Sequence, residues 1–194
     1  MVRTRTFDPS TALSKAVNLF ASKGYAETSM EDIVKATGVS RYGLYGTFGN
    51  KRELFEQALD RYADRMGKQS FLALFEPGAT LEDIRQIFRE RVEDLCDAGD
   101  RKGCLFIHTA MGLTAEDDDL RAVLRRYMKG MTKAFATGLE TAMQKGQVRD
   151  DVDVRAAGQM LTSTMFGLVV LGKSGFGQET LHSIVDNQLN SLAG

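Results

Sequence analysis

The chain has 194 residues, of which 43% are hydrophobic and 26% are charged, as in ordinary globular proteins. Its 25 basic and 26 acidic residues give a net charge of -1, which argues against a uniformly basic nucleic-acid coat protein and against an acidic tail. Two cysteines, Cys96 and Cys104, are too few to form a disulfide scaffold for a chain of this length, so both are expected to be reduced thiols. The N-terminus lacks the apolar core of a signal peptide, and the apolar run 165–171 is too short to span a membrane. We therefore predict a soluble, cytoplasmic protein with no membrane partner.

The first third of the chain is predicted to form helices that end at glycines. The apolar spacing over 13–20 is that of one helix face, with Ser10 or Thr11 as the candidate cap. A second helix is expected from about Met30 to Thr37, with Ser29 as its cap. Ser40 is expected to cap a third helix, over 41–47, and a long helix follows over 51–75.

Beyond this segment, Pro77-Gly78 marks a joint between helices. Apolar stripes, caps and glycines place the later helices at about 80–98, 103–113, 116–145, 154–171 and 179–192. No strand of convincing length and no internal repeat is visible. The predicted class is all-α, with about nine helices.

Residues 30–47 have the form of a helix-turn-helix. Gly38 suits the left-handed backbone that the turn requires, and Val39 points inward. Ser40 then starts a second helix whose N-terminal end is exposed, the part that such units present to the major groove of DNA. On that helix Arg41 suits a guanine edge or a phosphate, while Lys51 and Arg52 beyond it suit phosphates. The contrasting interpretation is ordinary packing and a solvated charged face.

The sequence here resembles the DNA-binding domain of TetR-type transcriptional regulators. The family pattern appears in order as Gly38-Val39-Ser40, Leu44-Tyr45, Phe48 and Lys51, and the match covers residues 10–60. One departure is Gly46, where histidine or another large residue often follows the tyrosine. The resemblance implies a DNA-binding domain over 1–50 and a ligand-binding and dimerisation domain over 51–194. The side chains expected to contact DNA are Thr28, Ser29, Ser40, Arg41, Tyr42, Tyr45, Thr47 and Lys51.

Charge is distributed unevenly along the chain in a way that supports DNA binding. Residues 1–52 hold eight basic and four acidic side chains, a net charge of +4, and the remainder carries -5. A positive face is what exchanges counterions with DNA phosphates. Arg3 and Arg5 are placed in an arm that can reach an adjacent groove.

The resemblance further implies a homodimer on a palindromic double-stranded operator and release by a small-molecule effector that the sequence does not identify. Dimerisation is expected through the last two helices. The alternative is that the apolar stripes of these helices form only the core of the monomer. The predicted dimer residues are Leu161, Met165, Leu168, Leu181, Val185 and Leu189. The predicted pocket residues are Phe88, Cys104, Ile107, His108, Met111, Tyr127, Met131, Met165 and Phe166. No metal or other cofactor is expected.

Cys104 supports an alternative. It lies near the start of a short helix, four residues before His108, where a helix dipole lowers the pKa of a thiol. Some TetR-type repressors sense electrophiles or oxidants through a cysteine at this place, so a switch by covalent modification of Cys104 is the alternative function. A buried structural cysteine is the plainer interpretation. A third hypothesis, an enzyme that uses Cys104 and His108, has no supporting motif in the sequence. A fourth, an architectural DNA-binding protein without an effector, also stays open.

Overall fold

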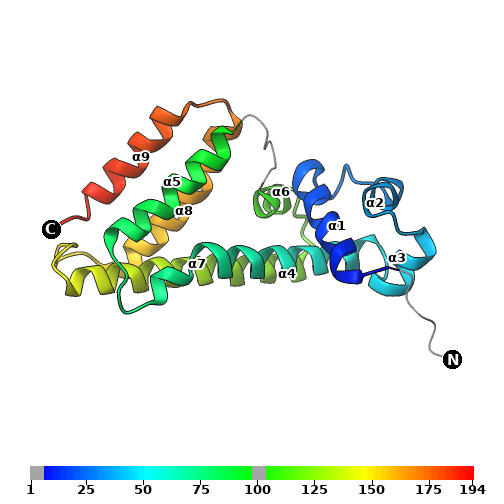
Figure 1. The fold of residues 1–194 in the computed structure, drawn as a ribbon, viewed down its shortest axis with the longest axis horizontal. Coiled ribbons are helices and arrows are strands. Elements are labelled where there is room, and N and C mark those ends of the chain that lie inside the picture. Colours follow the sequence, from blue (N-terminus) through cyan, green and yellow to red (C-terminus); the bar gives the residue numbers. More distant parts are fainter. Residues whose placement is uncertain (1–6, 98–103) are drawn as a thin grey trace. The chain divides into compact units, whose positions relative to one another are not determined.

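The computed structural model describes residues 7–97 and 104–194. Over these ranges it contains nine α-helices, one 3-10 helix and no strand beyond an isolated bridge between Val148 and Ala193, which confirms the all-α class (Figure 1). The helices are α1 (Pro9–Lys23), α2 (Met30–Thr37), α3 (Arg41–Phe48), α4 (Lys51–Ser70), η1 (Leu72–Phe75), α5 (Leu81–Cys96), α6 (Leu105–Met111), α7 (Asp118–Gln144), α8 (Val154–Lys173) and α9 (Gln178–Asn190).

The described residues form two compact units. We call residues 7–64 with 104–124 the head unit, and residues 65–97 with 125–194 the body unit. Helices α4 and α7 contribute to both. The head unit therefore includes α6 and the first part of α4 as well as the three N-terminal helices.

The first helix begins earlier than the sequence prediction placed it. The Asp8 carboxylate accepts hydrogen bonds from the backbone amides of Ser10 (3.1 Å) and Thr11 (2.9 Å), so Asp8 is the cap rather than Ser10 or Thr11. Pro9 is the first helical residue, a position at which the missing N–H costs nothing. The pair Asp8-Pro9 carries this signal in the sequence.

The boundaries of α2 are those predicted, Met30 to Thr37, because its ends are fixed locally. The Ser29 hydroxyl accepts from the Asp32 amide (3.1 Å), and the Asp32 carboxylate accepts from the Ser29 amide (2.9 Å), a complete capping box. Lys23 also donates to Asp32 at 2.7 Å and is the main reason that the pKa of Asp32 is lowered.

Aromatic side chains form much of the head unit's core. Phe20 of α1 packs edge-to-face against Phe55 of α4, with ring centroids 4.9 Å apart. Tyr62 of α4 lies 5.1 Å from Phe106 of α6, which attaches α6 to this unit. Such pairs contribute about 0.5–1.5 kcal/mol beyond the area they bury.

The body unit packs α5, α8 and α9 against one another, as Figure 1 shows, and against α7. Phe88 of α5 stacks on Phe135 of α7 at 5.4 Å. Gly158 of α8 sits so close to α7 that an added Cβ would lie 2.8 Å from the Thr132 carbonyl oxygen. The small residue therefore permits the close approach of the two helices.

The long helix predicted over 51–75 ends at Ser70, and Leu72–Phe75 forms the short helix η1 instead. Phe71 and Leu74 are both buried in the body core, and Leu74 packs against Gly138 of α7. The turn after Ser70 brings these two side chains inward, so tertiary packing overrides the helical spacing of the local sequence.

Candidate nucleic-acid interface

The turn between α2 and α3 has the geometry that the sequence predicts. Gly38 has φ +75°, in the left-handed region, and its amide donates to the Val34 carbonyl at 2.9 Å. Val39 is buried, and the Ser40 hydroxyl caps α3 by accepting from the Gly43 amide at 3.2 Å. Leu44 and Phe48 anchor the inner side of α3.

Gly43 is a structural requirement that sequence reasoning missed. A Cβ on this residue would lie 3.0 Å from Val39 and 3.3 Å from Phe7, so glycine allows the chain before α1 to pass close to α3. No such neighbour surrounds Gly46, where an added Cβ would meet nothing within 4 Å. The two glycines of α3 therefore have different roles.

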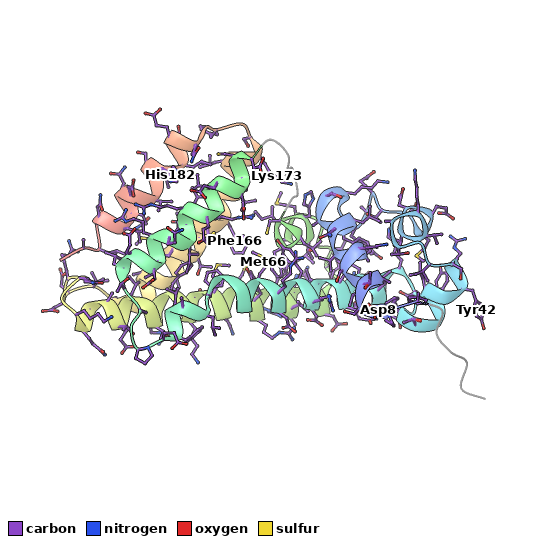
Figure 2. The ribbon with its side chains drawn as sticks, in the orientation of Figure 1. Asp8, Tyr42, Met66, Phe166, Lys173 and His182 are labelled. Atoms are coloured by element: carbon purple, nitrogen blue, oxygen red, sulfur yellow. The ribbon has the colours of Figure 1, made fainter. Side chains whose placement is uncertain are left out.

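The outer side of α3 presents polar and aromatic side chains. Tyr42 is 75% exposed and points outward from α3 in Figure 2, and Tyr45 is 44% exposed. Arg41 is exposed at the start of the helix and forms an ion pair with Glu31 of α2 at 2.9 Å. An exposed helix that begins with these side chains has the form of a reading helix for the major groove.

Lys51, at the start of α4, adds a cation close to this surface. Its ammonium lies 4.3 Å from the centroid of the Tyr25 ring, a cation–π contact. Partial burial lowers the pKa of Lys51, and the charge of Glu27 acts in the opposite direction.

Arg52 has a different environment from that of Lys51. It pairs with Glu56 on its own helix (2.7 Å) and with Asp117 in the loop before α7 (2.5 Å). The guanidinium that the sequence suggested as a phosphate contact is therefore engaged within the head unit.

Asp117 is a second feature that sequence reasoning missed. Its carboxylate accepts from the amide and the hydroxyl of Thr114, each at 2.7 Å, and from Arg52. The Thr114 bonds, followed by that from Arg52, lower the pKa of Asp117 to about 2. The sequence placed Asp117 only at the start of the helix predicted over 116–145, because its partner Arg52 is 65 residues away in the sequence.

Three more of the predicted contact residues lie in differing environments. Thr28 is buried, and its hydroxyl donates to the Gly24 carbonyl at 2.6 Å, so this side chain shapes the α1–α2 connection instead of reaching the surface. Ser29 is exposed, and Thr47 is half-buried. Arg3 and Arg5 lie outside the described residues.

The predicted ligand-pocket residues divide between the two units. In the body, Phe88, Met131 and Met165 are buried in the core, and Tyr127 and Phe166 are half-buried against it (Phe166 is labelled in Figure 2). The remaining four, Cys104, Ile107, His108 and Met111, belong to the head unit.

These four residues of the head unit differ in exposure. Cys104 is buried and precedes the first turn of α6, whereas Met111 is 84% exposed at the end of that helix. Ile107 is half-buried. His108 lines a cavity of about 440 Å³ together with Arg52 and Asp117.

The six predicted dimer residues are all buried within the body unit's own core: Leu161, Met165, Leu168, Leu181, Val185 and Leu189. The exposed stripe of α8 runs beside them at helical spacing and carries no charge: Ala156, Met160, Ser163, Gly167 and Val170. Apolar spacing alone does not distinguish the residues that face the chain's own core from those on the opposite side of the helix.

Comparison with known proteins agrees with the helix-turn-helix geometry. Residues 12–58 match the family model of bacterial regulatory proteins of the tetR family, and residues 80–175 match a tetracyclin repressor-like C-terminal domain. The HTH-type transcriptional regulator YezE of Bacillus subtilis is 32% identical over 99% of this chain and 100% of its own length. The HTH-type transcriptional repressor ComR of Escherichia coli is 28% identical over 96% of this chain and 90% of its own.

A solved structure is similar over nearly the whole chain. It contains a cysteine-substituted variant of the TetR family regulator CifR in complex with a 26-base-pair operator, with a TM-score of 0.85 at 26% identity, and covers 98% of this chain and 99% of that one. The fold and the reading helix define a helix-turn-helix DNA-binding protein. The chain belongs to the TetR family of bacterial transcriptional regulators.

Proposed function

We propose that this regulator is a repressor that binds a palindromic operator as a homodimer in the cytoplasm and is released by a small-molecule effector. The observation that carries the proposal is the exposed surface of α3, with Arg41, Tyr42 and Tyr45 after a left-handed turn at Gly38. Residues 1–50 would read the DNA, and 51–194 would bind the effector and form the dimer. Ser29, Ser40, Thr47 and Lys51 would supply further contacts around the reading helix.

DNA binding is tested on the intergenic DNA next to the gene by footprinting and gel shift. Arg41→Ala and Tyr45→Ala should each abolish protection of a specific site, because both side chains lie on the outer surface of α3. Arg149→Ala, which removes an exposed arginine in the body unit, is the matched control and should bind as the wild type does. Specific protection by both α3 variants would contradict this assignment of the reading helix.

Dimerisation would take place on the uncharged stripe of α8. Met160 and Val170 on this stripe are 38% and 51% exposed, which leaves apolar surface in water. Within the described residues, α8 is the single helix that meets the length and apolarity of a membrane span. A second copy that covers this surface accounts for its apolar character, and two heads would then read the two half-sites of a palindrome.

The oligomeric state of charged variants tests this surface. Val170→Asp and Met160→Asp should give monomers in sedimentation velocity at concentrations at which the wild type is a dimer, with unchanged helical circular dichroism. Leu72→Asp places the same charge on another exposed apolar residue and should stay dimeric. Dimers in both α8 variants would show that the chain associates elsewhere.

The effector would bind in the body unit beside the half-buried Tyr127 and Phe166. The chain contains no tryptophan, so Phe166→Trp creates a single indole fluorophore at this place. An effector that releases operator DNA should change its emission in a saturable manner. Phe75→Trp, at an exposed position on η1, is the control, and its emission should not change when the effector is added. Operator release without any change in the emission of Phe166→Trp would exclude effector binding at this place.

The redox alternative depends on Cys104, which directly precedes the first turn of α6. The thiol is buried, whereas Cys96 is exposed. If Cys104 is the switch, an oxidant should release operator from the wild type and from Cys96→Ser but not from Cys104→Ser. Release from Cys104→Ser would reject the thiol switch at this residue.

A further inference from the structure

The body unit carries a groove of about 560 Å³ between α7 and α8 whose charged lining residues are all cations. Lys129 and Lys133 of α7 and Arg155 of α8 are these cations, and all three are exposed. Its volume falls within the range of small-molecule sites, about 300–1,000 Å³.

The positive charge of the groove contrasts with the net negative charge of residues 53–194. Residues 120–139 contain five basic residues and no acidic ones, and α8 likewise has no acidic residue, although residues 53–194 together carry -5. Lys129 and Lys133 are four residues apart on one helix face, a spacing at which like charges repel. Repulsion between these two ammonium groups therefore lowers the stability of α7 when no anion is bound in the groove.

The groove's cations have no acidic partner within the described residues. The ion pairs of the body unit engage Arg85, Arg89 and Arg149 instead. Asp153, just before α8, directs its carboxylate to the backbone amides of Arg155 and Ala156. A bound anion would supply the missing counter-charge.

The other lining residues add hydrogen-bonding groups and apolar contact. The Thr132 hydroxyl lies 3.0 Å from that of Thr162, and Gln159 of α8 presents an amide. Met128 is a half-buried apolar residue of the same groove. An occupant with a charged end and a carbon skeleton matches this lining better than an inorganic ion does.

We propose that this groove binds a small organic phosphate, with the phosphate group between Lys129, Lys133 and Arg155 and the organic part against Met128. A guanidinium pairs with two phosphate oxygens at once, and two ammonium groups can neutralise the remaining charge. A monocarboxylate would balance only one of three cations. Neither Tyr127 nor Phe166, beside which we place the effector, lines this groove, and the proposal does not depend on that effector site.

The test uses the full chain labelled with 13C-methyl methionine at low ionic strength, with phenyl phosphate as the probe. Phenyl phosphate should shift the Met128 methyl resonance, assigned through Met128→Leu, in a saturable manner. Inorganic phosphate, which lacks the ring, and benzoate, which lacks the second charge, should each bind at least threefold more weakly. Absence of a saturable Met128 shift, or benzoate binding as tight as that of phenyl phosphate, would overturn the proposal.

Variants separate this site from general attraction to positive charge. Arg155→Gln and Lys133→Glu should each weaken phenyl phosphate binding at least fivefold, whereas Arg91→Gln on α5 removes one charge from the same unit and should leave it unchanged. An equal loss of phenyl phosphate affinity in all three variants would show that binding depends only on the overall positive charge, and would reject the site. A competing occupant of the groove is an acidic segment of a second copy of the chain. In that case Lys133→Glu will dissociate the dimer, and phenyl phosphate will not bind to the wild type. Either result would also reject the proposed phosphate site.

Discussion

At the scale of single residues, two neighbouring cations at the start of α4, Lys51 and Arg52, have different partners. Arg52 joins α4 to the loop before α7 through Asp117, and Thr114 fixes the same carboxylate from within that loop. Lys51, one residue before Arg52, contacts Tyr25 instead of a carboxylate. Of these two neighbouring cations, Lys51 is therefore the one available to a phosphate, and Arg52 holds the loop in place.

The Asp117 pairing makes the stability of the protein depend on pH in acid. Its pKa of about 2 in the folded chain is below the usual value of 3.8, so its stabilising effect is complete above about pH 4 and is lost as the pH falls through 2. Asp117→Asn should lower the thermal midpoint at pH 6, and the difference from wild type should shrink between pH 4 and pH 2. Asp119→Asn, an exposed neighbour, is the control and should show no such trend.

At the scale of helices, local signals fix some boundaries and tertiary contacts fix others. The capping box of Ser29 and Asp32 and the glycine at 38 determine both ends of α2, and these were predictable because they involve neighbouring residues. The end of α4 at Ser70 was not, since it depends on burial of Phe71 and Leu74 in a core built from distant helices.

The candidate site shows the same division between local and distant information. The glycine-valine-serine turn and the reading helix were predictable from spacing, and so was the exposure of Tyr42 and Tyr45. The pairing of Arg52 with Asp117 was not, because the two residues are 65 positions apart in the sequence. The contacts with DNA, effector and second copy stay predictions.

The glycines at 38 and 46 provide a matched pair that separates backbone conformation from packing. A Cβ at either position would meet nothing within 4 Å, but only Gly38 has a positive φ. Gly46→Ala should raise the free energy of unfolding by up to about 1 kcal/mol, because alanine favours helix. Gly38→Ala should lower the free energy of unfolding by about 1 kcal/mol, because the Cβ of alanine disfavours the left-handed conformation. Urea denaturation of both variants measures the difference, and equal effects would contradict it.

At the scale of the whole molecule, an overall charge of -1 conceals a segment of +4 over residues 1–52 and a remainder of -5. The positive segment attracts DNA phosphates, while the negative remainder limits non-specific adhesion of the rest of the chain to DNA. Affinity for the operator should therefore depend strongly on salt, because cations of the head displace counterions from the DNA.

Lys51 provides a direct measure of that dependence. Lys51→Gln should reduce the slope of the logarithm of operator affinity against the logarithm of salt concentration by about 1, as expected for one lost phosphate contact. Arg149→Gln in the body unit should leave the slope as it is in the wild type. Fluorescence anisotropy between low and physiological salt gives both slopes, and an unchanged slope for Lys51→Gln would show that this ammonium does not contact DNA.

The ion pair between Arg41 and Glu31 places a competitor for DNA on the reading surface itself. In the proposed complex, a phosphate or base that contacts Arg41 must first displace the Glu31 carboxylate, which also repels the phosphates of any DNA. Because the pair is exposed, the barrier is modest, about 1 kcal/mol or less, equivalent to at most about a fivefold loss of affinity. If Arg41 contacts DNA as proposed, Glu31 is a built-in competitor of the operator, and its removal should tighten binding to operator and random DNA alike, by at most about fivefold.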